Sequence, residues 1–208
     1  MEAVNRYQVS ADILSEFLEV AIHGILYNRS LYPHGVFQRR KKYNVPIQVC
    51  LHPDVTIYIS RIVESCKILL ETGEIEKIVI IILSSDNFTP LERFSFEIAH
   101  NVSHNKTSDE YLFEMEASLR SFLLKLTVCD AMLKPLPEDC TWTVHIHTRD
   151  SAVGKIEEKQ TKDFPWIEAE ESQTVLKDPL LVPLRAMKSD YFKLQLFVEE
   201  TGEKGQMI

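Results

Sequence analysis

A helical segment that is apolar on more than one face constrains the fold of this chain most strongly. Residues 9–31 carry nonpolar side chains on several sides of a helix: Ile13, Leu14, Phe17, Leu18, Val20, Ala21, Ile22, Ile25 and Leu26. Such a helix is stable only when other elements cover it on several sides. We therefore predict that it is the central helix of the core, ended by Pro33 and Gly35.

The remaining pattern predicts two more helices and a set of antiparallel strands. Pro53 and Gly73 mark the second helix, because Pro suits the first helical turn and Gly the position after the last. The third helix is expected at residues 109–130, and residues 37–46 are expected to be irregular. Strands are expected at residues 74–83, 91–98, 141–148 and 191–198. This order predicts an α+β domain, with helices packed on one face of an antiparallel sheet.

The segment between residues 149 and 190 shows neither the apolar period of a helix nor that of a strand. It nevertheless contains Phe164, Trp166 and Ile167, and it leads into the last predicted strand. Long loops in compact domains are usually functional or disordered, and large aromatic side chains followed by a strand argue against disorder. We interpret this segment as a strap that holds another polypeptide.

Composition and charge argue against several classes of protein. The formal net charge of −8 at pH 7 repels phosphate backbones, so direct nucleic-acid binding is not expected. Glu16 and Glu19 interrupt the apolar residues where a signal peptide needs an uncharged core. The longest apolar run, residues 78–83, is too short to span a membrane. The cysteines form no CxxC pair, and we expect reduced thiols in a nuclear or cytosolic protein. They are Cys50, Cys66, Cys129 and Cys140.

Motifs of catalysis and metal binding are not found. The sequence contains no GxGxxG, GxxxxGK[ST], HExxH or GxSxG, so we expect neither an enzyme nor a cofactor. His145 and His147 point the same way on a strand, but a zinc site would need them to converge with Cys50 and His52. Solvent-facing histidines and a core thiol are favoured, because no pair has finger-like spacing. For the basic run at residues 39–42, we favour a solvated loop over a nuclear address or a phosphate contact.

Two surfaces carry outward apolar groups. One stripe of the third helix belongs to the core: Leu112, Met115, Leu119, Phe122 and Leu126. Its neighbouring stripe consists of Phe113, Ala117, Arg120 and Leu124. Apolar groups around one Arg are typical of protein association, although the helix could equally be buried on both sides. The last strand leaves Tyr191, Lys193, Gln195 and Phe197 on its outer face, a second docking surface unless a loop covers it.

Several stretches resemble the HORMA-domain family, and within it the adaptors of translesion DNA polymerase zeta. They are residues 17–21, 37–46, 128–131, 147–149 and 162–167. The resemblance implies three helices on an antiparallel sheet and a C-terminal safety belt that wraps a proline-containing peptide of a partner. It also implies one HORMA domain over residues 1–208. Its parts would be a core at about 9–148, the belt and closing strands at about 149–200, and a short disordered tail at 201–208.

The resemblance further implies roles for individual residues. The peptide channel would contain Tyr32, Tyr58, Phe164, Trp166 and Ile167. Arg120 matches the position at which HORMA protomers dimerise, surrounded by Phe113, Ala117 and Leu124. The surface that docks the C-terminal domain of the Rev-one transferase would contain Leu181, Gln195 and Phe197. The chain departs from the family at Phe197, usually Tyr, and at Glu168, usually Leu.

These matches imply a non-catalytic adaptor that clamps the catalytic subunit of polymerase zeta and bridges it to Rev-one in translesion synthesis. Further candidate partners are a second HORMA protomer, in a homo- or heterodimer, and an AAA+ remodelling ATPase. The expected location is the nucleus, with the cytoplasm second. The alternative is a mitotic checkpoint regulator that sequesters cell-cycle proteins through an open and a closed state. Two separately purifiable conformers would favour that alternative.

Overall fold

A computed structural model describes the backbone of residues 2–100, 108–149, 166–170, 174–189, 192–202 and 204. The side chains of these residues are described except at positions 2–7, 100 and 108–112. The elements are α1 (Glu2–Asn28), η1 (His34–Val36), β1 (Phe37–Lys42), β2 (Val45–Cys50), α2 (Pro53–Glu71), β3 (Ile75–Ser84), β4 (Pro90–His100), α3 (Ser108–Val128), η2 (Cys129–Met132), β5 (Cys140–Thr148), β6 (Pro179–Lys188) and β7 (Phe192–Thr201). None of the helices in these ranges is long and apolar enough to cross a bilayer.

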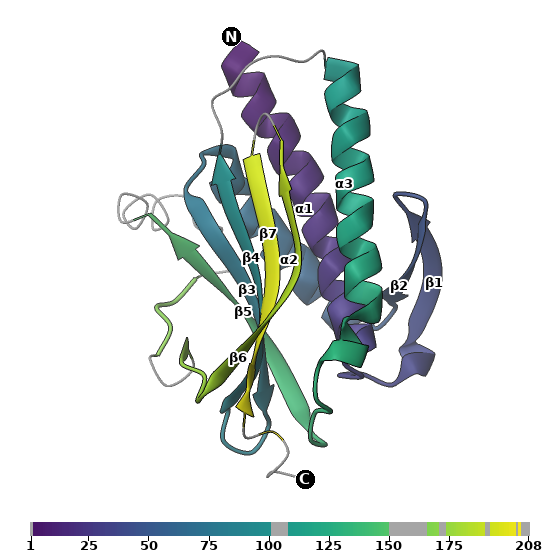
Figure 1. Ribbon diagram of the computed structural model, residues 1–208, viewed down its shortest axis with the longest axis vertical. Helices are drawn as coiled ribbons and strands as arrows, with labels where there is room; N and C mark the ends of the chain where they lie inside the picture. The colour runs from purple at the N-terminus through teal and green to yellow at the C-terminus, as the bar shows by residue number, and fades with distance from the viewer. Residues whose placement is uncertain are drawn as a thin grey trace.

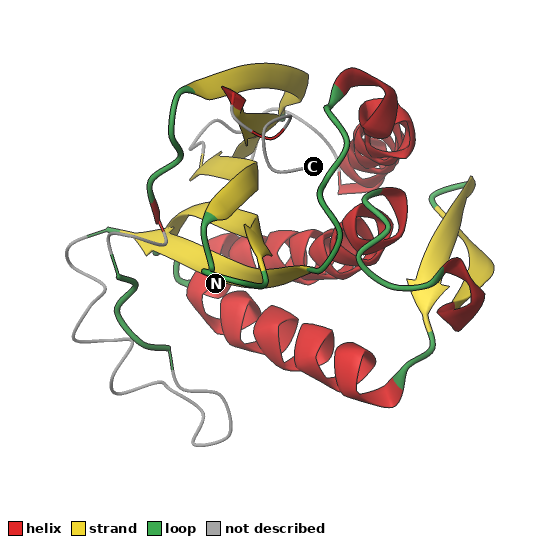
Figure 2. Ribbon diagram, turned by 90° about the horizontal axis from the view of Figure 1, so that it is seen from below, coloured by secondary structure: helices red, strands yellow, loops and turns green. Residues whose placement is uncertain are grey.

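Three layers make up the fold. The antiparallel sheet has the strand order β5-β3-β4-β7-β6, and the three long helices cover one of its faces (Figure 1). The β1–β2 hairpin lies on the far side of the helices from the sheet (Figure 2). This arrangement confirms the predicted α+β architecture. It also places β5 and β6, which are consecutive along the chain, at opposite edges of the sheet.

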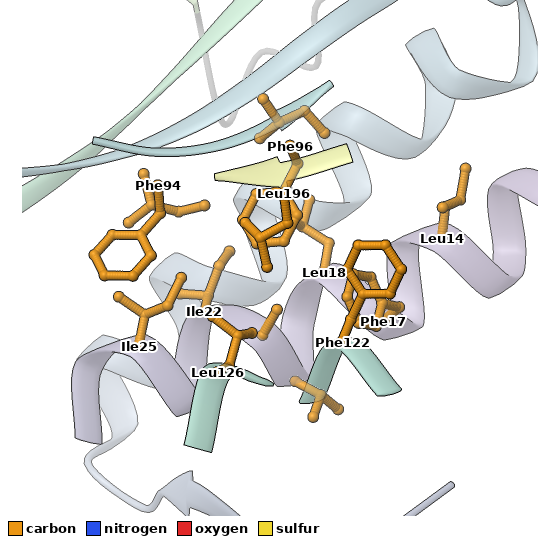
Figure 3. Packing of buried hydrophobic residues seen from close by; sticks show 14 of the residues in the cluster. Leu14, Phe17, Leu18, Ile22, Ile25, Phe94, Phe96, Phe122, Leu126 and Leu196 are labelled. Carbon is orange, nitrogen blue, oxygen red and sulfur yellow. The ribbon is translucent and has the colours of Figure 1, made fainter. Parts of the chain in front are cut away.

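The core confirms the prediction that the first helix is central. α1 packs between α2 and α3 and also against β2. Its Phe17 meets the rings of Phe96 in β4 and Phe122 in α3 edge-on, with ring centroids 6.1 and 5.9 Å apart. Figure 3 shows side chains of α1 meeting those of β4, β7 and α3 in one core. A helix apolar on several faces is thus buried on several faces.

Residues 37–46 were expected to be irregular, but they form most of the β1–β2 hairpin. The strands pair from Phe37↔Cys50 to Lys42↔Val45. Tyr43 and Asn44 close the turn with φ of 46° and 59°. Positive φ at both central residues matches the twist of a two-residue hairpin, but the usual signal for such a turn is Asn-Gly or Asp-Gly. The sequence does not predict this hairpin, because a Tyr-Asn turn carries no such signal.

β6 interrupts the segment that was expected to be a strap without strand period. Most of its side chains are exposed, and it contains Pro179 and Pro183. An edge strand needs no strict alternation of buried and exposed residues, and it tolerates Pro. Residues 201 and 204 were expected to belong to a disordered tail, but Thr201 ends β7 and the side chain of Lys204 is fully buried.

Candidate functional site

The outer edge of β5 pairs with no other strand in the part of the chain that the structure describes. Within the described ranges β5 pairs only with β3, from Ile75↔Thr148 to Ser84↔Cys140. A strand with one neighbour presents a row of N–H and C=O groups on its other side, which is a template for strand addition. Trp142, Val144 and Ile146 point into the core, as predicted, so an added strand would contact backbone rather than these side chains.

An aromatic cluster of Tyr32, Tyr58 and Trp142 lies near the amino end of β5. The indole N–H of Trp142 donates to the Tyr32 hydroxyl at 3.0 Å. The ring of Tyr58, on α2, meets the Trp142 ring edge-on at 5.2 Å. Burial raises the pKa of the Tyr58 hydroxyl, and a hydrogen bond with Thr143 of β5 opposes that rise. The structure thus brings together the two predicted channel tyrosines from different elements.

Trp166 ties the segment after β5 to the helical layer. Its indole N–H donates to Ser65 Oγ on α2, and its half-buried ring packs on the core. The side chain of Ile167 is 86% exposed, and Phe164 lies outside the described residues. Of the three predicted channel residues in this segment, the structure therefore places Trp166 against the domain and Ile167 at its surface.

α2 is a regular helix that positions both Tyr58, for its contact with Trp142, and Ser65, for its hydrogen bond with Trp166. Pro53 occupies the first helical turn and Asp54 lies where the N-terminal dipole favours an acid. Tyr58 and Ser65 are seven residues apart, which puts them on one helix face about 10 Å from each other along the axis. Ser65 and Trp142 were not predicted as site residues. The sequence showed a small residue on an apolar helix face and an inward Trp, which are ordinary core patterns.

A cavity of about 740 Å³ adjoins the amino end of β5. Residues 29–33, directly after α1, form one wall. Asp130, residue 133 and residues 135–140, which lead into the start of β5, form the other. Tyr32 belongs both to this cavity and to the aromatic cluster. Space for side chains of a guest peptide therefore continues beyond the end of the open edge.

The second stripe of α3 is exposed to solvent. Phe113 is 76% exposed and Leu124 48%, and Ala117 and Arg120 are also exposed. The opposite stripe is buried at its described positions: Met115, Leu119, Phe122 and Leu126. The alternative, in which α3 is covered on both sides, is therefore wrong for this chain.

The predicted docking surface on the last strands is only partly accessible. Leu181 is 60% exposed and Gln195 is exposed, but Phe197 is only 7% exposed. Phe197 pairs with Pro183 and Ser95 in the neighbouring strands, and the Lys77 amine lies 5.9 Å from its ring centroid. Its ring contributes little surface, because neighbours on the outer face cover it.

The predicted histidine pair stays on the outer face of β5. His145 and His147 are register partners of Val79 and Lys77 in β3. Burial lowers the pKa of both imidazoles. Within the described residues, no three His, Cys, Asp or Glu side chains gather as metal ligands would.

Comparison with known proteins gives consistent matches over most of the chain. The HORMA domain family model matches residues 10–177. The mitotic spindle assembly checkpoint protein MAD2B of Gallus gallus is 49% identical over 203 residues, covering 97% of this chain and 96% of that protein. The DNA polymerase zeta processivity subunit of Arabidopsis thaliana is 35% identical over 187 residues, covering 89% of this chain and 83% of that protein.

Solved structures show the same fold. A chain in the crystal structure of the mitotic checkpoint complex matches with a TM-score of 0.79 at 23% identity, covering 94% of this chain and 96% of that chain. C. elegans HTP-2 bound to the HIM-3 closure motif matches with a TM-score of 0.70 at 12% identity, covering 93% and 91%. At these identities the likeness concerns the fold alone.

Proposed function

The chain belongs to the HORMA domain family, and from this membership we propose that it is a non-catalytic adaptor that captures a peptide beside β5. A guest segment would add to the open edge as a further strand, so that backbone hydrogen bonds supply affinity and side-chain pockets supply selectivity. HTP-2, which shares the fold, is itself bound to a closure motif. Two neighbouring features carry the proposal. One is the open edge of β5, and the other is Trp166, whose indole fixes the segment after β5 to α2.

The aromatic cluster fits a guest that contains proline. Proline-rich segments dock on aromatic grooves, because their extended conformation is already formed before binding. Tyr32 and Tyr58 offer such surfaces near one end of the edge. The captured segment would belong to the catalytic subunit of DNA polymerase zeta. The Arabidopsis relative, a DNA polymerase zeta processivity subunit by name, supports that assignment.

Two other surfaces would carry further partners of a nuclear complex in translesion synthesis. Leu181 and Gln195 would dock the C-terminal domain of Rev-one, and their exposure supports this role. The exposed stripe of α3 around Arg120 would bind a second HORMA protomer. An AAA+ ATPase would reopen the belt when the peptide must be released.

Replacement of Trp166 by Ala tests the capture site. Trp166→Ala removes the hydrogen bond to Ser65 and the ring that packs on the core, so the segment after β5 would no longer be fixed to α2. We expect pull-down of the catalytic subunit to fall by about tenfold or more, as is usual for a central aromatic anchor, with an unchanged circular dichroism spectrum. Val175→Ala, at a position of the same segment that is 59% exposed, is the control. Equal pull-down by wild type and Trp166→Ala would contradict the proposal.

A checkpoint role is the second candidate, favoured by the name of the Gallus gallus relative. In that role the chain would sequester cell-cycle proteins by switching between open and closed states. Ion-exchange chromatography of the guest-free protein distinguishes the two. A pair of slowly interconverting conformers would support the switch, and a single species would support the polymerase adaptor.

A further inference from the structure

The β6–β7 hairpin anchors the carboxyl end of the connection that follows β5. The belt connection, residues 149–178, joins β5 at one edge of the sheet to β6 at the other edge. β6 pairs only with β7 within the described strands, and β7 attaches the hairpin to β4. Separation of β7 from β4 would therefore free the end of this connection from the sheet.

A buried ion cluster joins the end of this hairpin to the core. We define it as Arg29, directly after α1, Glu92 in β4, Glu200 in β7 and Lys204 after β7. Arg29 contacts Glu92 with two hydrogen bonds of 2.6 and 3.0 Å. The Lys204 amine donates to Glu92 and, at 2.9 Å, to Glu200. None of these four side chains is more than 5% exposed.

The strand register explains why this cluster needs its lysine. Glu92 and Glu200 are direct partners in the β4–β7 ladder. Like charges directly opposite each other on neighbouring strands destabilise the pairing, and burial strengthens their repulsion. The Lys204 amine bonds to both carboxylates. A cation from the last residues of the chain therefore neutralises a repulsion that would otherwise separate β7 from β4.

Neighbouring contacts extend the attachment to the end of the belt connection. The Thr201 hydroxyl donates to the Lys177 carbonyl at 2.9 Å, and the Gly202 N–H donates to the Asp178 carbonyl at 3.2 Å. Glu200 also accepts the backbone N–H of Lys134 at 3.0 Å. The residues around Lys204 thus hold the start of β6, the end of β7 and the core together.

We propose that Lys204 is an electrostatic latch that keeps the β6–β7 hairpin docked on β4 and thereby slows the opening of the belt. Loss of its charge leaves two buried carboxylates opposite each other, balanced by Arg29, which also pairs with Asp130, and by the charge of Lys134 near Glu200. Removing one partner of a buried ionic group is strongly destabilising, and here the strain falls on a single pair of strands. The hairpin then opens locally while the rest of the sheet stays folded.

Hydrogen exchange of the guest-free, full-length protein tests the latch. We expect Lys204→Met to speed amide exchange in β6 and β7 at least tenfold, with exchange in β3 unchanged. Lys67→Met is the matched control, because Lys67 forms an ion pair with Asp12 between α1 and α2 and does not contact the hairpin. Equal acceleration in every strand, or no acceleration in β6 and β7, would overturn the latch.

A double variant separates electrostatic latching from simple packing. Adding Glu200→Gln to Lys204→Met removes the unbalanced carboxylate, so that Arg29 and Glu92 again neutralise each other. We expect the double variant to exchange more slowly in β7 than Lys204→Met alone. If the two exchange equally fast, the lysine acts by filling space and the latch is refuted. Should Lys204→Met alone not fold, a double variant that does fold supports the latch, because removal of the Glu200 charge then compensates for the loss of Lys204. A double variant that also fails to fold refutes the latch.

The effect on belt opening rests on the proposed function and has a separate readout. A fragment of the polymerase zeta catalytic subunit, immobilised on a sensor, should release Lys204→Met at least tenfold faster than wild type. If exchange in β6 and β7 rises as expected but the wild-type protein does not bind the fragment, the adaptor proposal fails and the latch stands. If binding is tight and release is unaltered despite an open hairpin, the latch does not control the belt.

Discussion

His23 links two layers of the molecule through a single buried imidazole. It lies on α1 with 2% of its surface exposed, and its Nδ1 accepts the backbone N–H of Cys50 in β2 at 3.2 Å. This hydrogen bond needs an unprotonated Nδ1. Burial also disfavours the charged ring and lowers the pKa of His23 to about 4. The contact of α1 with the β1–β2 hairpin therefore depends on a neutral histidine.

The pH dependence of stability follows from this residue. Between pH 6.5 and 4 the unfolded chain binds a proton at this imidazole and the folded chain does not, so the free energy of unfolding rises with pH across that window. We expect His23 to make the protein about 2 kcal/mol less stable at pH 5 than at pH 7. Urea denaturation at both values measures the difference.

The matched variants isolate the contribution of His23. Asparagine at this position can still accept the Cys50 N–H, because its Oδ1 is as far from Cβ as Nδ1 is, but it cannot be protonated. His23→Asn should therefore lose most of the difference between pH 5 and pH 7. His52→Asn, at an exposed position before α2, should keep it. An undiminished difference in His23→Asn would show that other groups cause the acid sensitivity.

At the scale of one element, α3 separates a core face from an exposed face that we propose as a docking surface. Phe113, Ala117, Arg120 and Leu124 form the exposed stripe. An Arg surrounded by apolar side chains is a common anchor of protein interfaces. We expect Arg120→Ala to weaken self-association at least tenfold, which moves the sedimentation profile toward the monomer at a given concentration.

The same helix supplies a control for charge. Lys125→Ala removes one positive charge from an exposed position of α3 outside the stripe, and its sedimentation profile should match that of wild type. If Arg120→Ala sediments in the same way as wild type and Lys125→Ala, the stripe is not a dimer interface.

Elements with a regular apolar pattern could be predicted from the sequence, and the β1–β2 hairpin and β6 could not. α1, α2 and α3 repeat their apolar pattern over several turns, and β3, β4 and β5 carry clear apolar or alternating runs. The β1–β2 hairpin depends on two residues with positive φ, and β6 depends on pairing with β7. Neither cause leaves a periodic trace in the local sequence.

The candidate site shows the same division. Trp166 could be identified because a large aromatic in a segment without period needs a reason. Its partner Ser65 is 101 residues away, and the Trp142 that joins the two tyrosines looked like a core residue. Contacts of such separation arise from the packing of α2 on β5, which no local pattern reveals. The resemblance to HORMA proteins supplied Tyr32 and Tyr58, which periodicity alone did not.

On the scale of the whole molecule, the strand order separates two proposed binding surfaces. The open edge belongs to β5 and the docking residues Leu181 and Gln195 belong to β6 and β7, across the sheet. Four strand spacings, roughly 19 Å, separate the two edges, so the two proposed surfaces share no residues. An adaptor with this geometry can bridge two proteins while each surface is altered independently.

Leu181→Arg tests that independence. Leu181 is 60% exposed on an edge strand, so a charged side chain fits there without disturbing the core, but it would oppose burial against an apolar partner. We expect pull-down of the Rev-one C-terminal domain to fall at least tenfold, with capture of the polymerase catalytic subunit unchanged. Leu180→Arg changes the neighbouring residue, which is 49% exposed and points to the opposite face of β6, and should leave both interactions intact. Loss of both partners in Leu181→Arg would mean that the two surfaces are coupled, and binding of Rev-one at wild-type strength would remove β6 from the docking surface.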